Sequence, residues 1–156
     1  MSEQTTLLAR KHVRFGWLML AAFAIVGITL EGFHGFKTSW YLEEGYETRR
    51  LLFTLGHAHG ALLALINIVF GVATAVLGGN HARLLQVSRL LAAGTVLLPA
   101  GFFLGGFGIY GADPGVGIYL VPIGALCALA AFAVAAFSND APQNDVPAVR
   151  TKKTKR

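Results

Sequence analysis

The sequence predicts an all-α integral membrane protein whose four transmembrane helices form an up-down bundle. Of its 156 residues, 54% are hydrophobic and only 13% are charged, and the mean hydropathy is +0.58. A soluble domain carries about 25% charged residues, and disordered chains are poor in apolar residues. The composition therefore excludes a disordered chain and argues against an ordinary water-soluble domain.

Four apolar stretches are long enough to cross a bilayer, which requires about 20 residues of helix. They span residues 14–35, 51–78, 86–108 and 115–138. None shows the alternation of polar and apolar residues over about ten positions that is typical of a transmembrane barrel strand. These stretches define a predicted transmembrane domain over 14–138, which follows an N-terminal segment over 1–13.

The individual stretches carry further signals. Basic residues precede the first stretch, as in a signal peptide, but Glu31-Gly32-Phe33 follows it without a small-residue cleavage pattern. We therefore expect a retained span. Pro99 and Pro122 lie inside the third and fourth stretches, where proline frees a backbone carbonyl and bends a helix. Both lie at about the depth of His57, which favours a cavity open to the outer side.

Lysine and arginine are distributed unevenly between the two ends of the predicted helices. The outer connections contain only Lys37, Arg49 and Arg50. The opposite side holds ten of the thirteen basic residues: Arg10, Lys11, Arg14, Arg83, Arg89, Arg150, Lys152, Lys153, Lys155 and Arg156. Because cytoplasmic flanks carry an excess of these residues, we predict that both termini lie in the cytoplasm.

Residues 139–156 form a polar tail that contains Pro142 and Pro147 and ends in Thr-Lys-Lys-Thr-Lys-Arg. Such a segment cannot bury a core, so we expect a disordered, basic cytoplasmic tail. The formal net charge of the chain is +5. No nucleic-acid-binding motif accompanies that charge, so the predicted partner is the lipid bilayer and not a nucleic acid.

Ionisable side chains inside a membrane are costly, so each is a candidate functional residue. Glu31 and His34 are three positions apart near the outer end of the first span. They therefore lie on one helix face, where they can share one metal ion or hydrogen-bond to each other. Small residues on the same face predict that both side chains point inward.

The second span contains the sequence Gly-His-Ala-His-Gly around His57 and His59. Two residues apart on a helix, these imidazoles point about 200° away from each other. The side of His57 carries small residues and is expected to face the bundle, whereas bulky residues surround His59. We therefore expect His59 to face lipid, a neighbouring subunit or a cofactor. At similar predicted depths, Glu31, His34 and His57 can share one layer.

Other polar and small residues have structural interpretations. Asn67, in the middle of the second span, predicts an interhelical hydrogen bond, whereas His12 and His81 lie in flanks and are expected to be solvated. Gly101 and Gly105 form a G-x-x-x-G motif, which predicts close helix packing within the chain or in a homo-oligomer.

Two sequence runs carry a resemblance. The run Arg-Arg-Leu-Leu-Phe-Thr-Leu-Gly-His-Ala-His-Gly from Arg49 and the later Leu-Leu-Pro-Ala-Gly-Phe-Phe-Leu-Gly-Gly resemble small uncharacterised bacterial four-span membrane proteins with an HAHG motif. This resemblance extends from about Glu31 to the end of the fourth span and implies a bacterial inner membrane. A looser similarity, limited to His57 and His59, is to the H-x-H helix of haem–copper oxidase catalytic subunits, where two imidazoles bind different haems.

These observations lead to three functional hypotheses. The first is an inner-membrane protein with a metal or haem site near the periplasmic side. Imidazole and carboxylate suit Cu, Fe or Zn, and two imidazoles suit haem b. In this hypothesis Glu31, His34 and His57 are metal ligands, while His57 and His59 bind the cofactor. The alternatives are a non-catalytic accessory or assembly subunit of a membrane complex, and a proton-coupled small-solute carrier that acts as an oligomer. No catalytic residue is assigned.

Overall fold

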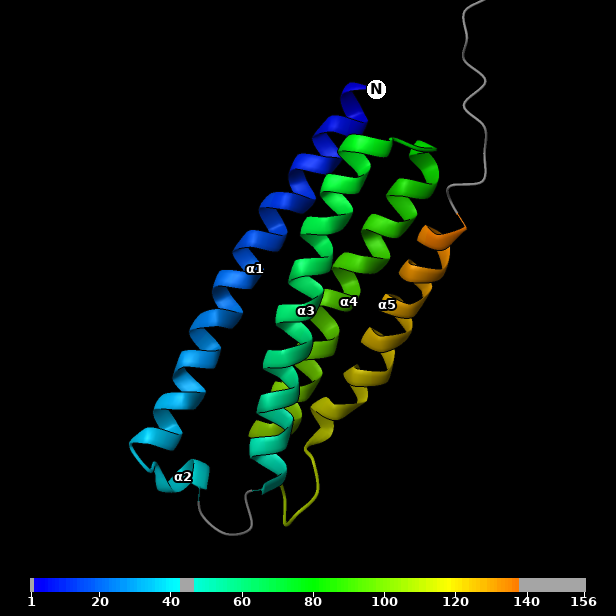
Figure 1. Cartoon of the computed structure of the whole chain (residues 1–156). Helices are drawn as coiled ribbons and strands as arrows, with labels where there is room; N and C mark the ends of the chain where they lie inside the picture. The colour runs from blue at the N-terminus through cyan, green and yellow to red at the C-terminus, as the bar shows by residue number, and fades with distance from the viewer. Residues whose placement is uncertain (1, 43–46, 138–156) are drawn as a thin grey trace, which may run out of the picture.

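Four long helices lie side by side in the computed structural model, which describes residues 2–42 and 47–137 (Figure 1). The elements are α1 (Glu3–Gly35), α2 (Ser39–Leu42), α3 (Glu47–Leu77), α4 (His81–Phe107), a 3-10 turn η1 (Val116–Tyr119) and α5 (Leu120–Ala136). No strand is present in these described ranges. The predicted all-α bundle is therefore confirmed.

The four long segments have the length and apolar composition of membrane-spanning helices. They are α1, α3, α4 and the segment Val116–Ala136, which joins η1 and α5. Figure 1 shows the N-terminus, the α3–α4 connection and the end of α5 at one end of the bundle, which we call the N-terminal end. The short helix α2 lies at the other end, the α2 end. The predicted tail, 139–156, lies outside the described residues.

Three helices, α1, α3 and α4, begin earlier than the predicted spans. Helix α1 starts at Glu3 because Ser2 caps it: the Ser2 Oγ atom accepts a hydrogen bond from the Thr5 backbone nitrogen at 3.2 Å. Helix α4 starts at His81, where the Oδ1 atom of Asn80 accepts from two backbone nitrogens at 3.0 and 3.3 Å. Hydropathy alone does not register these caps, because it reports apolar length and not backbone hydrogen bonding.

Helix α3 occupies the middle of the arrangement. It packs against α1 on one side and α4 on another, and α4 in turn packs against α5. Among the described residues, α5 contacts only α4 and the turn before it. Helices α1 and α3 approach each other closely at glycines. A Cβ atom added at Gly16 would lie only 2.7 Å from the carbonyl oxygen of Ala64. The same distance separates such an atom at Gly71 from the carbonyl oxygen of Ala9.

The G-x-x-x-G motif packs within the chain. A Cβ atom at Gly101 would lie 2.7 Å from the backbone nitrogen of Val121, and one at Gly105 would lie 3.4 Å from Ile118. These glycines therefore let α4 approach the start of α5, and they are not a free surface for a partner. Pro122 lies in the first turn of α5, where a missing N–H is tolerated, so the interior kink predicted there is not formed.

The apolar core lies along α3, α4 and α5. It consists of Leu52, Leu63, Val87, Leu91, Leu98, Phe102, Ala128 and Ala131. Large apolar side chains remain exposed on the outer surfaces of α1 and α5, including Ile28 and Leu126. This distribution is the one expected when lipid covers the outside of a helical bundle.

Candidate functional site

His57 lies on the seam between α3 and α1. Its Nδ1 atom donates a hydrogen bond to the carbonyl oxygen of Phe23 on α1 at 2.9 Å. The ring also lies against Gly27, where a Cβ atom would be 2.7 Å from the Cε1 atom of His57. His57 thus faces another helix, as the small residues around it predict, and its Nε2 atom has no hydrogen-bond partner among the described residues.

His59 lies on the other side of α3, but that side is also packed. Its Nδ1 atom donates to the carbonyl oxygen of Leu55 at 2.9 Å. The centroid of its ring is 5.2 Å from that of Phe102 on α4. The bulky side of α3 therefore faces α4. The expectation that bulky residues mark a lipid-facing side does not hold here, because a central helix has two packed sides.

Glu31 and His34 are exposed near the α2 end of α1. The ring of His34 meets the edge of Tyr41, with a centroid distance of 5.1 Å. Among residues 2–42 and 47–137, no three His, Cys, Asp or Glu side chains lie close enough together to hold one metal ion. The predicted three-ligand set of Glu31, His34 and His57 is therefore not assembled in this part of the chain.

A buried polar network joins α1, α3 and α4, and Asn67 is the one member that the sequence indicated. His12 is only 4% exposed, whereas we expected it to be solvated. Its Nδ1 atom lies 2.8 Å from the Oδ1 atom of Asn67, and its Nε2 atom lies 2.7 Å from the Oγ atom of Ser88. Asn67 in turn donates through Nδ2 to Leu63 and to Thr95. The predicted interhelical hydrogen bond of Asn67 is thus confirmed.

The partners in this network fix the direction of each hydrogen bond. Both donors of the Asn67 amide are used, because Nδ2 lies 2.8 Å from the Leu63 carbonyl oxygen and 2.8 Å from the Thr95 hydroxyl oxygen. Its Oδ1 atom can only accept, so the Nδ1 atom of His12 must carry the proton. The Thr95 hydroxyl donates to the Leu91 carbonyl oxygen at 2.7 Å. Each polar group is satisfied, which indicates a structural clamp between three helices.

An apolar groove opens between α1 and α4 near the α2 end, where these two helices contact each other little. Its volume is about 460 Å³. The lining residues are Ile25, Val26, Thr29, Leu30, Phe33, Trp40, Phe53, Phe103 and Phe107. We call this the aromatic groove. Its polar member is Thr29, whose hydroxyl donates to the Ile25 carbonyl oxygen at 2.9 Å. Neither His57 nor His59 lines it.

The aromatic rings of the groove contact one another from four helices, and Phe33 on α1 joins them through Trp40 at 6.2 Å between centroids. The ring of Phe53 on α3 lies 4.8 Å from that of Phe107 and 5.7 Å from that of Phe103, measured between centroids. Trp40 on α2 lies 6.0 Å from Phe53. Aromatic pairs at these separations attract one another beyond the burial of their surface. The groove wall is therefore a connected set of rings.

Arg49 holds the α2 end of this groove in place. It is 6% exposed, and its guanidinium donates to the carbonyl oxygens of Trp40 at 2.7 Å and of Gly106 at 3.2 Å. The guanidinium carbon also lies 4.3 Å from the centre of the Trp40 ring. In the sequence, Arg49 is recognisable only as a flanking charge. It instead links α2, α3 and α4.

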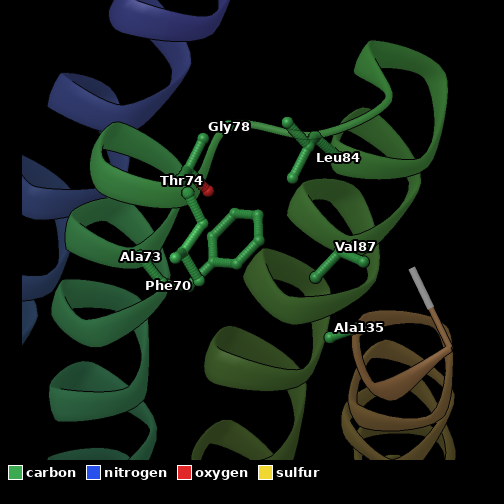
Figure 2. A pocket seen from close by; sticks show the side chains of 8 residues that line it. Phe70, Ala73, Thr74, Gly78, Leu84, Val87 and Ala135 are labelled. Carbon is green, nitrogen blue, oxygen red and sulfur yellow. The ribbon is translucent and has the colours of Figure 1, made fainter. Parts of the chain in front are cut away.

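A smaller cavity of about 120 Å³ lies near the N-terminal end, between α3, α4 and α5 (Figure 2). Phe70, Leu84, Val87 and Ala135 contribute to its apolar wall. Thr74 is 2% exposed, and its hydroxyl has no hydrogen-bond partner within residues 2–42 and 47–137. In Figure 2 this oxygen points toward the space between α3 and α4. The cavity thus contains one unsatisfied polar atom in an otherwise apolar wall.

The candidate site residues predicted from the sequence therefore lie in different parts of the bundle. His57 faces α1, His59 faces α4, and Glu31 and His34 are exposed. The aromatic groove is formed by other residues. No protein-family model, curated protein or solved structure matches this chain.

Proposed function

We propose that this chain is an integral membrane protein that binds a lipophilic ring compound of the quinone class in the aromatic groove. The observation that carries the proposal is the wall of the groove, in which five aromatic side chains surround about 460 Å³. Binding sites for small molecules commonly enclose about 300–1,000 Å³ and are lined mainly by apolar and aromatic residues. The groove has both properties.

A ring fits this wall better than a lipid acyl chain does. Aromatic pairs contribute about 0.5–1.5 kcal/mol beyond the burial of surface, and an acyl chain gains only the burial. Thr29 adds a polar contact, because its hydroxyl donates to its own helix and its oxygen still accepts. Ile25 and Phe107 are 65% and 62% exposed, so the groove is open on the surface that faces lipid in a membrane.

The two tryptophans of the chain provide a matched test. Trp40 lines the groove, whereas Trp17 lies on an exposed part of α1 outside it. The variants Trp17→Phe and Trp40→Phe each leave one tryptophan, whose emission is selected by excitation at a wavelength that tyrosine does not absorb. In phosphatidylcholine nanodiscs titrated with decylubiquinone, we expect saturable quenching of Trp40 and a linear, non-saturating response of Trp17. Equal responses of the two tryptophans would contradict the proposal.

The wall itself can be tested with a second pair of variants. Phe103→Ala removes one ring of the groove, and the loss of one aromatic contact is expected to weaken binding about two- to tenfold. Phe132→Ala removes a partly exposed ring on α5, which does not line the groove. This control is expected to leave the saturable quenching unchanged.

A haem or metal ion on His57 or His59 is the second candidate. One feature favours it: each Nδ1 atom donates to a backbone carbonyl at 2.9 Å, which leaves Nε2 as the atom with a lone pair. Histidines that bind metals are commonly oriented in this way. Further ligands would come from a second copy or from outside the described residues. Purified protein with neither Soret absorbance nor stoichiometric metal would contradict this candidate.

A further inference from the structure

A second groove, at the N-terminal end, combines basic and apolar side chains. It lies between the first turns of α1 and the start of α4 and has a volume of about 430 Å³. The lining residues are Gln4, Leu7, Leu8, Arg10, Lys11, Arg14, His81 and Leu85. We call this the basic groove. It is distinct from the aromatic groove, which lies near the α2 end.

The charge of the basic groove is not neutralised by the described part of the chain. Arg10, Lys11 and Arg14 are exposed, and none forms an ion pair with residues 2–42 or 47–137. The ion pair that these ranges contain, Arg50 with Glu47, lies at the α2 end. Three cationic groups therefore converge on one groove without an acidic partner there.

His81 adds a polar group to the same wall. Its Nδ1 atom is buried and has no hydrogen-bond partner in the described part of the chain. The ring of His81 nevertheless lines the groove, so an imidazole from α4 lies beside the cations of α1. The ring of His81 on α4 and the cations on α1 line the same groove, so together they form a site between two helices.

The position of the groove relative to a membrane favours a lipid. A bilayer core about 30 Å thick is crossed by about 20 helical residues, whereas α1 contains 33. The additional turns of α1 place Arg10 and Lys11 at the level of the headgroups. Leu7, Leu8 and Leu85 line the groove beside them and provide apolar contacts for the start of an acyl chain.

The geometry points to the phosphate headgroup of an anionic phospholipid as the ligand of the basic groove. Arginine and lysine bind phosphate oxygens through charge-assisted hydrogen bonds, and basic pockets between transmembrane helices bind anionic headgroups. A free phosphate ion would satisfy the cations but would leave the three leucines without a partner. The ligand is therefore a lipid of the surrounding bilayer.

Lipid selection by the purified full-length protein tests this inference. After incubation with equimolar phosphatidylglycerol and phosphatidylcholine in detergent, native mass spectrometry is expected to show retained phosphatidylglycerol. The double variant Arg10→Gln/Lys11→Gln should lose this preference about 25-fold, since each basic residue near the surface contributes about fivefold. Both side chains are exposed, so the variant is expected to keep its helicity by circular dichroism.

A charge-matched variant separates a site from general attraction. Arg83→Gln/Arg89→Gln removes two cations from the N-terminal end of α4, outside the basic groove. This variant is expected to keep the preference for phosphatidylglycerol. Equal losses in the two double variants would show that net charge alone selects the lipid and would overturn the inference. Displacement of the lipid by millimolar inorganic phosphate would also overturn it, because the site would then bind the free ion.

Discussion

The Nδ1 atom of His12 on α1 donates a hydrogen bond to the Oδ1 atom of Asn67 on α3 across 2.8 Å, and both side chains are buried. Asn67 also donates to Thr95 on α4. A single amide therefore connects three helices. Hydrogen bonds of this kind replace the hydrophobic force that is missing between helices surrounded by lipid.

A double-mutant cycle on His12 and Asn67 measures this coupling. We expect the variants His12→Ala and Asn67→Ala to interact by about 0.6–1.7 kcal/mol, the range found for hydrogen bonds between transmembrane helices. The free energy of unfolding is measured by titration with sodium dodecyl sulfate in mixed micelles. Ser88→Ala, which removes one bond of His12, should cost less than Asn67→Ala. A coupling energy of zero would contradict the clamp.

Two buried threonines should respond in opposite directions to replacement by valine. The Thr74 hydroxyl has no hydrogen-bond partner among the described residues, so Thr74→Val is expected to raise the free energy of unfolding by about 1 kcal/mol. The Thr95 hydroxyl accepts from Asn67 and donates to Leu91, so Thr95→Val should lower it by about 1–2 kcal/mol. The same micelle titration compares them. Similar effects of both substitutions would indicate that Thr74 is hydrogen-bonded.

Because α1 and α3 pack closely, adding one methyl group at Gly60 is expected to lower the stability of the protein strongly. A Cβ atom at Gly60 would overlap the buried ring of Phe23, whereas one at Gly35 would meet nothing within 4 Å. Gly60→Ala is therefore expected to cost about 1–3 kcal/mol of stability through overpacking. Gly35→Ala, the matched control on α1, should be neutral. Unfolding midpoints by circular dichroism decide between these outcomes.

Arg49 and Arg50 are neighbours in the sequence, but replacing each by lysine is expected to cost different amounts of stability. The buried guanidinium of Arg49 donates to two carbonyl oxygens and lies over Trp40, and a lysine cannot reproduce this fork. Arg49→Lys is expected to cost about 1–3 kcal/mol. Arg50→Lys keeps a half-buried charge near Glu47 but loses the hydrogen bond from the Arg50 guanidinium to the Tyr41 carbonyl oxygen at 3.2 Å, so it should cost about 1 kcal/mol, less than Arg49→Lys. An equal loss would show that charge alone, and not the fork, is required.

Hydropathy predicted the number and order of the long helices, because each apolar run is close to the length that crosses a bilayer. It placed the start of α1 at residue 14, whereas Ser2 caps a helix that begins at Glu3. That error hid His12, which then fell in a flank. Ala9 and Gly16 lie three positions before and four after it, and such small residues mark a packed face. This periodicity was the available signal.

The candidate sites were less accessible from sequence. Residue size separated the two sides of α3 into a small-residue side and a bulky side. Because α3 lies between α1 and α4, however, both sides are internal. The aromatic groove depends on how far α1 and α4 diverge. That distance is a property of the tertiary packing, and no periodicity in a single helix encodes it.

The row of helices has a consequence for assembly during synthesis. Each long helix packs on the long helix that precedes it in the chain, and α5 touches only α4 and its own leading turn within the described ranges. Contacts between consecutive segments need little search by the chain. Each newly inserted helix can therefore dock on a surface that is already complete. A chain truncated after Phe107 keeps the helices against which α1 and α3 pack. The last helix, α5, then covers only the remaining side of α4.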